Sequence, residues 1–135
     1  MRHLFAVLLL CSICSAQEAD GTVYIYRLPS FYGMAGNPKL FLDNKEVGKI
    51  RNGRFFSIMV PVGHHIVTST RKKSGVDLDV QSGQTYYIKT SLAPGGFGIN
   101  PAEVSLVATE QGRYAVSNLK PAEQGDLKVD FAHAR

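Results

Sequence analysis

The chain contains a series of short segments in which apolar residues dominate or alternate with polar ones. The sharpest is residues 76–80, where Val76, Leu78 and Val80 alternate with two aspartates. Such alternation predicts a β-strand with one buried face and one solvated face. The strands expected on this basis are residues 22–28, 39–42, 46–50, 55–60, 65–70, 76–80, 85–92 and 103–109.

Turn-forming residues separate these segments. Asn52-Gly53 is the strongest hairpin signal, because both residues tolerate positive φ. No segment of helix length lies between neighbouring strands, so parallel strands joined by helices are not expected. The pattern predicts a mainly β protein: one antiparallel β-sandwich of about seven or eight short strands, immunoglobulin-like or transthyretin-like. A short C-terminal helix is expected over 113–119, and the polar residues 121–135 are expected to form a disordered tail.

Residues 1–16 have the pattern of a secretory signal peptide. The first three residues form a short basic stretch, residues 4–14 are almost entirely apolar, and Ser15-Ala16 supplies small residues before a polar stretch. As a helix, the apolar run would be only about 16 Å long, well short of a hydrocarbon core of ~30 Å. We therefore expect cleavage after Ala16, export to the periplasm or the medium, and no transmembrane span in the mature chain.

Both cysteines, Cys11 and Cys14, fall inside this signal. The domain expected over 17–120 then has no thiol, which excludes cysteine catalysis and cysteine-ligated metal within it. A lipid anchor on Cys14 is the alternative, disfavoured because Ile13 stands where lipoprotein signals generally have a small residue. The net charge of +4 is mild and scattered, so a nucleic-acid partner is not expected.

The candidate chemical groups are two histidines and two aspartates. His64 and His65 are adjacent at the start of a predicted strand, so they point to opposite faces and cannot chelate one ion together. Asp77 and Asp79 share a face, but no third acidic residue lies nearby in the sequence. An enzyme would require His65 to meet Asp77 or Asp79 within hydrogen-bond reach. We predict no catalytic residues, no metal and no cofactor.

Two glycine-rich loops, residues 29–38 and 93–101, carry apolar and aromatic side chains, and the first strand presents two tyrosines on one face. These features offer binding surfaces, and the loop hypothesis requires both loops to lie at the same end of the sandwich. The candidate ligand or partner contacts are Tyr24, Tyr26, Phe31, Tyr32 and Phe97.

Several short motifs occur in a recognisable order: residues 21–27, 42–48, 52–56, 60–65 and 83–87. In this order and spacing, the chain resembles an uncharacterised bacterial exported family, domain of unknown function number 2846, over roughly residues 21–120. It is also similar to PEGA-type surface domains, which are small β-sandwiches, although Val62 stands where a second proline is usual. The resemblance implies an exported or lipid-anchored protein and supplies no catalytic residues. It marks Gly53, Gly63, His65 and Gly83 as fold-defining turn and strand-start positions.

Three functions are compatible with these observations. The leading one is an exported, non-enzymatic module that binds or scaffolds in the cell envelope, with an envelope protein or polymer as its partner. The alternative is a small-molecule or glycan-binding protein that uses the glycine-rich loops. The third is a hydrolase-type enzyme built on His65.

Overall fold

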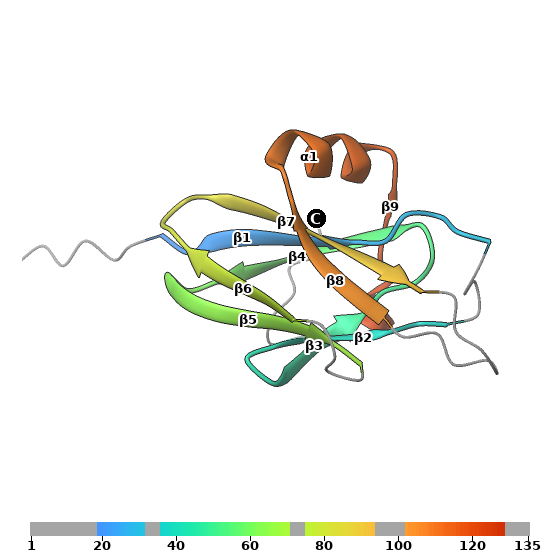
Figure 1. Ribbon diagram of the computed structural model, residues 1–135, viewed down its shortest axis with the longest axis horizontal. Helices are drawn as coiled ribbons and strands as arrows, with labels where there is room; N and C mark the ends of the chain where they lie inside the picture. Colours follow the sequence, from blue (N-terminus) through green and yellow to red (C-terminus); the bar gives the residue numbers. More distant parts are fainter. Residues whose placement is uncertain (1–18, 32–35, 71–74, 94–101, 129–135) are drawn as a thin grey trace, which may run out of the picture.

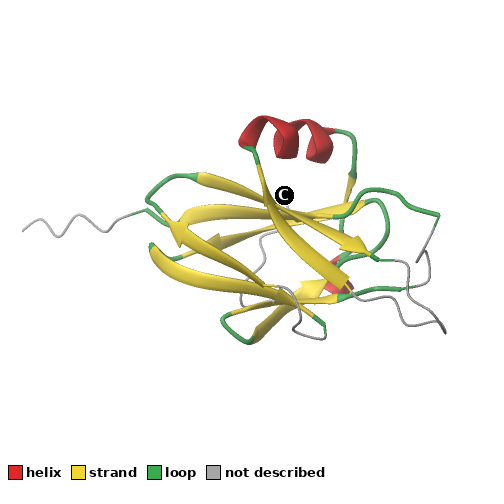
Figure 2. Cartoon of the chain, in the orientation of Figure 1, coloured by secondary structure: helices red, strands yellow, loops and turns green. Residues whose placement is uncertain are grey.

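This computed structural model describes residues 19–31, 36–70, 75–93 and 102–128, which form two β-sheets with one α-helix outside them (Figures 1 and 2). In chain order the elements are β1 (Gly21–Tyr26), β2 (Lys39–Leu42), β3 (Lys45–Lys49), β4 (Arg54–Val60), β5 (Gly63–Ser69), β6 (Gly75–Val80), β7 (Thr85–Leu92), β8 (Ala102–Val107), α1 (Thr109–Ser117), β9 (Lys120–Pro121) and the 3-10 helix η2 (Gln124–Asp126). One sheet has the order β8-β7-β1-β4-β9 and the other the order β3-β2-β5-β6. The prediction of a mainly β protein with one short helix is confirmed.

The core lies between the two sheets and is built from the inward positions of their strands. Ile25 of β1 and Ile58 of β4 pack in one cluster with Leu40 of β2 and Val67 of β5. Burying an aliphatic side chain of this size contributes about 1.5–3 kcal/mol. The alternation predicted for residues 76–80 is confirmed, because β6 shows strictly alternating buried and exposed positions.

The strand pairing differs in part from the antiparallel arrangement expected. The pairs β2–β3, β5–β6 and β7–β8 are antiparallel. However, β1 pairs parallel with β7, and β4 pairs parallel with β9. Parallel neighbours need a long connection but not a helical one. Here the chain between β1 and β7 passes through the other sheet. The immunoglobulin-like or transthyretin-like assignment stays a prediction.

The hairpin expected at Asn52-Gly53 is also absent, because β3 and β4 belong to different sheets. Gly53 does adopt a positive φ of 70°, but the turn carries the chain from one sheet to the other. The two-residue hairpin turn with positive φ occurs instead at Asp43-Asn44, between β2 and β3. Positive φ at both residues is typical of a type I′ turn.

The C-terminal region is more ordered than its composition predicts. The helix expected over 113–119 is present as α1, which begins earlier, at Thr109. In the expected tail, the Ala122 N–H donates to the Phe55 carbonyl at 2.8 Å, and Leu127 is buried in the core cluster. Residues 121–128 are therefore packed rather than disordered. Residues 129–135 lie outside the described chain.

Candidate functional site

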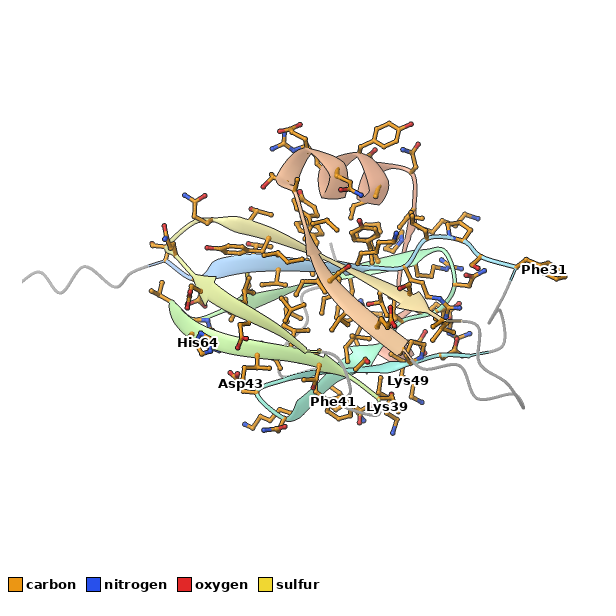
Figure 3. The ribbon with its side chains drawn as sticks, in the orientation of Figure 1. Phe31, Lys39, Phe41, Asp43, Lys49 and His64 are labelled. Carbon is orange, nitrogen blue, oxygen red and sulfur yellow. The ribbon has the colours of Figure 1, made fainter. Side chains whose placement is uncertain are left out.

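The parallel pairing of β1 and β7 determines where the two glycine-rich loops begin. Tyr26 at the end of β1 is opposite Lys89 of β7, so both strands leave the sheet at the same end (Figure 1). Phe31, which is 86% exposed, extends away from the sheets at this end (Figure 3). The described flanks of both loops thus share one end. The other two loop candidates, Tyr32 and Phe97, lie outside the described residues.

A cavity of about 170 Å³ opens at this end, between the residues that follow β1 and the last residues of β7. We call it the Arg27 cavity. Its described lining combines two basic side chains, three hydroxyl side chains and an apolar wall, without a carboxylate: Arg27, Leu28, Pro29, Ser30, Lys89, Thr90, Ser91 and Leu92. Pockets that bury drug-sized ligands measure roughly 300–1,000 Å³, so this cavity fits a small group.

Arg27 is the charged residue that the fold places most deeply at this cavity. It continues the inward alternation of Val23 and Ile25 and is only 1% exposed. One guanidinium nitrogen, Nη1, donates a hydrogen bond to the carbonyl of Gly36, on the segment that leads into β2. Burial lowers the pKa of Arg27, because desolvation disfavours its charged form. The pKa of an arginine is so far above neutral that the guanidinium stays protonated even after this lowering. The lining therefore holds a buried positive charge.

Thr90 adds a buried hydroxyl to the same lining. It is 1% exposed and continues the inward phase of Ile88 on β7. Its Oγ1 has no hydrogen-bond partner among the residues that the structure describes. By contrast, the buried Ser69 hydroxyl donates to the carbonyl of Ala102 at 2.6 Å. A buried hydroxyl without a partner costs about 1–3 kcal/mol, so Thr90 leaves the cavity with an unsatisfied polar group.

The rim of the cavity is fixed by a side chain from the β3–β4 turn. The Asn52 side chain accepts a hydrogen bond from the Ser30 N–H at 2.9 Å and donates one to the Ser30 carbonyl at 3.2 Å. This pair of bonds holds the segment after β1 against the turn.

The two histidines have different partners from those that the enzyme hypothesis requires. His65 Nδ1 lies 2.6 Å from Asp43 Oδ2, and its Nε2 lies 2.7 Å from the Pro61 carbonyl. It is His64, on the other face of β5, that meets Asp79 at 3.0 Å and Asp77 at 3.3 Å. The proposed contact of His65 with Asp77 or Asp79 is therefore wrong.

Both histidine groups lie far from the Arg27 cavity, because β5 begins where β1 also begins. Figure 3 shows His64 and Asp43 toward the end opposite Phe31. Hydrogen bonding to Asp79 raises the pKa of His64; desolvation opposes this, and the charges of Asp79 and Asp77 add to the rise. These histidines belong to the architecture around the β2–β3 turn and the start of β5.

Asp43 is the residue that links that turn to β5. Its Oδ1 accepts the Ile66 N–H at 2.9 Å, and its other oxygen faces His65. Burial acts to raise the pKa of Asp43. The hydrogen bonds from His65 and the Ile66 N–H, with the charges of His65 and His64, outweigh burial and hold this pKa below its ordinary 3.8.

We expect Asp43→Asn to destabilise the protein by at most about 1 kcal/mol at neutral pH, since the group is largely solvated. Asparagine tolerates the φ of 48° at this position and keeps an acceptor for Ile66. Because the folded-state pKa of Asp43 is depressed, the carboxylate's contribution is present above its unfolded pKa and is lost as pH falls through the folded value. Urea unfolding from about pH 7 to pH 2 should show the two proteins converging in acid. A difference that does not change with pH would contradict this role.

The two tyrosines of β1 contribute to packing on the outer face of their sheet. The Tyr24 ring stacks on Tyr87 with centroids 5.1 Å apart and lies 6.3 Å from Phe55. Helix α1 packs over Tyr87 through Gly112. Tyr26 is 1% exposed, and its assignment as a contact stays a prediction. Tyr24 is partly exposed, and its contact stays a prediction.

The three glycines that the motifs single out all have positive φ: Gly53 at 70°, Gly63 at 134° and Gly83 at 68°. A side chain is disfavoured at such angles, so these positions suit glycine.

Among the described residues, no group of three or more histidine, cysteine or carboxylate side chains is placed to hold a metal ion. Within the same ranges, no helix has both the length and the apolar character needed to cross a bilayer.

Sequence reasoning missed Arg27 and Thr90 as site residues. A signal was present for each: Arg27 is a charged residue in the inward phase of an apolar strand, and Thr90 follows Ile88 in the same way. A polar residue at an inward position close to a strand end indicates a buried polar site.

Comparison with known proteins places the chain in a family. Residues 17–103 match the family described as "Protein of unknown function (DUF2846)", and the chain belongs to it. An "Uncharacterized protein" of Haemophilus influenzae is 31% identical over 110 residues, which cover 80% of this chain and 64% of that protein. The chain thus spans less than two thirds of that relative's length. No solved structure matches the chain.

Proposed function

We propose that the chain is an exported, non-enzymatic β-sandwich module that binds a small ligand group in the Arg27 cavity. The observation that carries this proposal is the parallel register of β1 and β7, which gathers the cavity and the described flanks of both glycine-rich loops at one end. Export rests on the signal-peptide pattern of residues 1–16. The partner would be a component of the cell envelope or a small molecule within it.

Binding is favoured over catalysis by the chemistry of the lining. The described lining residues include no histidine, aspartate or glutamate, the usual general bases at neutral pH. The histidine–carboxylate contacts lie at the other end of the molecule, where His65 is held between Asp43 and Pro61. The cavity volume of about 170 Å³ suits one small group or a chain end better than a stretch of glycan.

One preparation tests both parts of this proposal. Isotope-labelled protein made from the full chain and recovered from the periplasmic fraction should have Gln17 as its first residue, as measured by intact mass. Titration with small neutral, cationic and anionic solutes should then shift amide NMR signals at Arg27, Leu28, Ser30 and residues 89–92. These residues surround the cavity.

Shifts on the outward face of β6 provide the spatial control, because Asp77 and Asp79 are exposed and do not belong to the described cavity lining. Shifts that scatter over the surface, or that gather on β6, would overturn the binding site. A full-length mass with residues 1–16 retained in a cytoplasmic fraction would overturn export.

A further inference from the structure

We infer that the Arg27 cavity is a carboxylate site: it receives a single carboxylate attached to a small apolar group. This inference deepens the proposed binding function and rests on it. The residues that would form this site are Arg27, Thr90 and the apolar residues of the described lining.

The charge of the cavity favours an anion. Arg27 and Lys89 are the charged residues in the described lining, and both are basic. Because Arg27 is 1% exposed, its charge is screened less by solvent than that of a surface arginine. An anion in the cavity would offset the desolvation that lowers the pKa of Arg27.

Thr90 supplies the second, independent observation. Its Oγ1 is buried in the lining and has no partner among the described residues, although a hydroxyl can donate one hydrogen bond and accept others. A carboxylate oxygen accepts such a bond, and bonds to a charged acceptor are roughly twice as strong as neutral ones. A carboxylate in the cavity would therefore satisfy Thr90 and face Arg27 at the same time.

Charge and size favour carboxylate over phosphate. A carboxylate carries one negative charge, whereas a phosphate carries close to two and presents more oxygens than the described lining has buried donors. The remaining wall, made by Leu28, Pro29 and Leu92, is apolar and suits a short alkyl group. The ligand class is therefore a small aliphatic acid or a chain end that carries a free carboxylate.

Butyrate is the probe that tests this, with butyramide as its neutral counterpart and inorganic phosphate as the competing anion. In NMR titrations of the whole protein, butyrate should shift the amides of Ser30, Thr90 and Ser91, whereas butyramide should bind at least about tenfold more weakly. Thr90→Val and Arg27→Lys should each raise the Kd for butyrate about tenfold or more. Thr90→Val removes no hydrogen bond seen in the described structure, so it should fold with unchanged or higher stability.

Two matched variants control for general effects. Thr68→Val removes another buried, unpartnered hydroxyl that is not part of the lining, and Arg113→Lys changes an exposed arginine on α1. Neither should change butyrate affinity. A short peptide with a free C-terminus that binds when its amidated form does not would identify a chain end as the source. Butyrate binding without peptide binding would identify a free small acid.

The outcomes separate this inference from the proposed function. If butyramide shifts the same amides as strongly as butyrate, the cavity binds ligands but is not a carboxylate site. If phosphate binds more tightly than butyrate, or if Thr90→Val leaves the Kd unchanged, the carboxylate inference also fails. If none of the solutes shifts the amides around the cavity, the proposed binding function fails with it.

Discussion

Replacing Gly112 with alanine should lower the free energy of unfolding by about 2–3 kcal/mol, even though alanine is the better helix former by about 1 kcal/mol. A Cβ at position 112 would lie 2.2 Å from both Cβ and Cγ of Tyr87. Those atoms are close to the backbone of β7 and cannot swing away, so α1 must lift from the sheet. The stacked rings of Tyr87 and Tyr24 would then lose their packing against α1. Urea unfolding measures the destabilisation, and near-ultraviolet circular dichroism reports on the tyrosines.

Gly125→Ala is the matched control, because a Cβ at Gly125 would meet no atom within 4 Å. Its effect should stay within about 0.5 kcal/mol. A Gly112→Ala protein as stable as the parent, with an unchanged tyrosine signal, would mean that α1 does not pack on β7 through this residue.

The strands were predictable because their signal is local. Strict alternation, as in Val76, Leu78 and Val80, depends only on which face of a strand is buried, and the structure confirms it. β1 carries two tyrosines on one face and two aliphatic residues on the other, a pattern that suits a strand with neighbours on both sides, and it is the third strand of five. Which strand pairs with which is not local. The parallel neighbour of β1 is β7, some sixty residues away, and no property of either strand alone specifies that pairing.

The candidate site shows the same division. The opposite faces of His64 and His65 followed from the side-chain period of a strand. Their interaction partners, however, depend on non-local structure. The register of the β5–β6 pair places His64 opposite Asp79, and the β2–β3 turn brings Asp43 to His65. The predicted ligand contacts were all aromatic residues, whereas the described cavity lining includes Arg27 and Thr90, whose inward positions in their strands were the better signal.

The packed C-terminal segment was missed for a different reason. It is mostly polar and has no hydrophobic period, so the isolated apolar residues Ala122 and Leu127 gave no pattern to interpret. Their burial depends on non-local contacts: β9 adds to the edge of β4, and Leu127 forms a bridge with Gly48 of β3. A single apolar residue in a polar segment can close a core when the backbone around it is hydrogen-bonded to both sheets.

Leu127→Ala should therefore destabilise the protein by about 2–3 kcal/mol, near the lower end of the range for buried leucines, because Leu127 lies at the margin of the core and is 8% exposed. Loss of the leucine side chain should also weaken two neighbouring interactions. These are the hydrogen bond from the Lys128 N–H to the Val47 carbonyl, 3.1 Å long, and the Arg51–Asp126 ion pair. Urea unfolding measures the first effect, and hydrogen exchange at Ala122 and Lys128 measures the second.

Leu106→Ala is the control for this substitution. Because Leu106 is 49% exposed, its replacement should lower the free energy of unfolding by less than about 1 kcal/mol. If the two leucines gave equal losses, or if Leu127→Ala left exchange at Lys128 unchanged, residues 121–128 would not be part of the core. If Leu127→Ala is costly and Leu106→Ala is not, the polar C-terminal segment links the two sheets: β9 is bonded to β4 of one sheet and Leu127 to β3 of the other. The segment would then contribute to the stability of the fold that presents the Arg27 cavity.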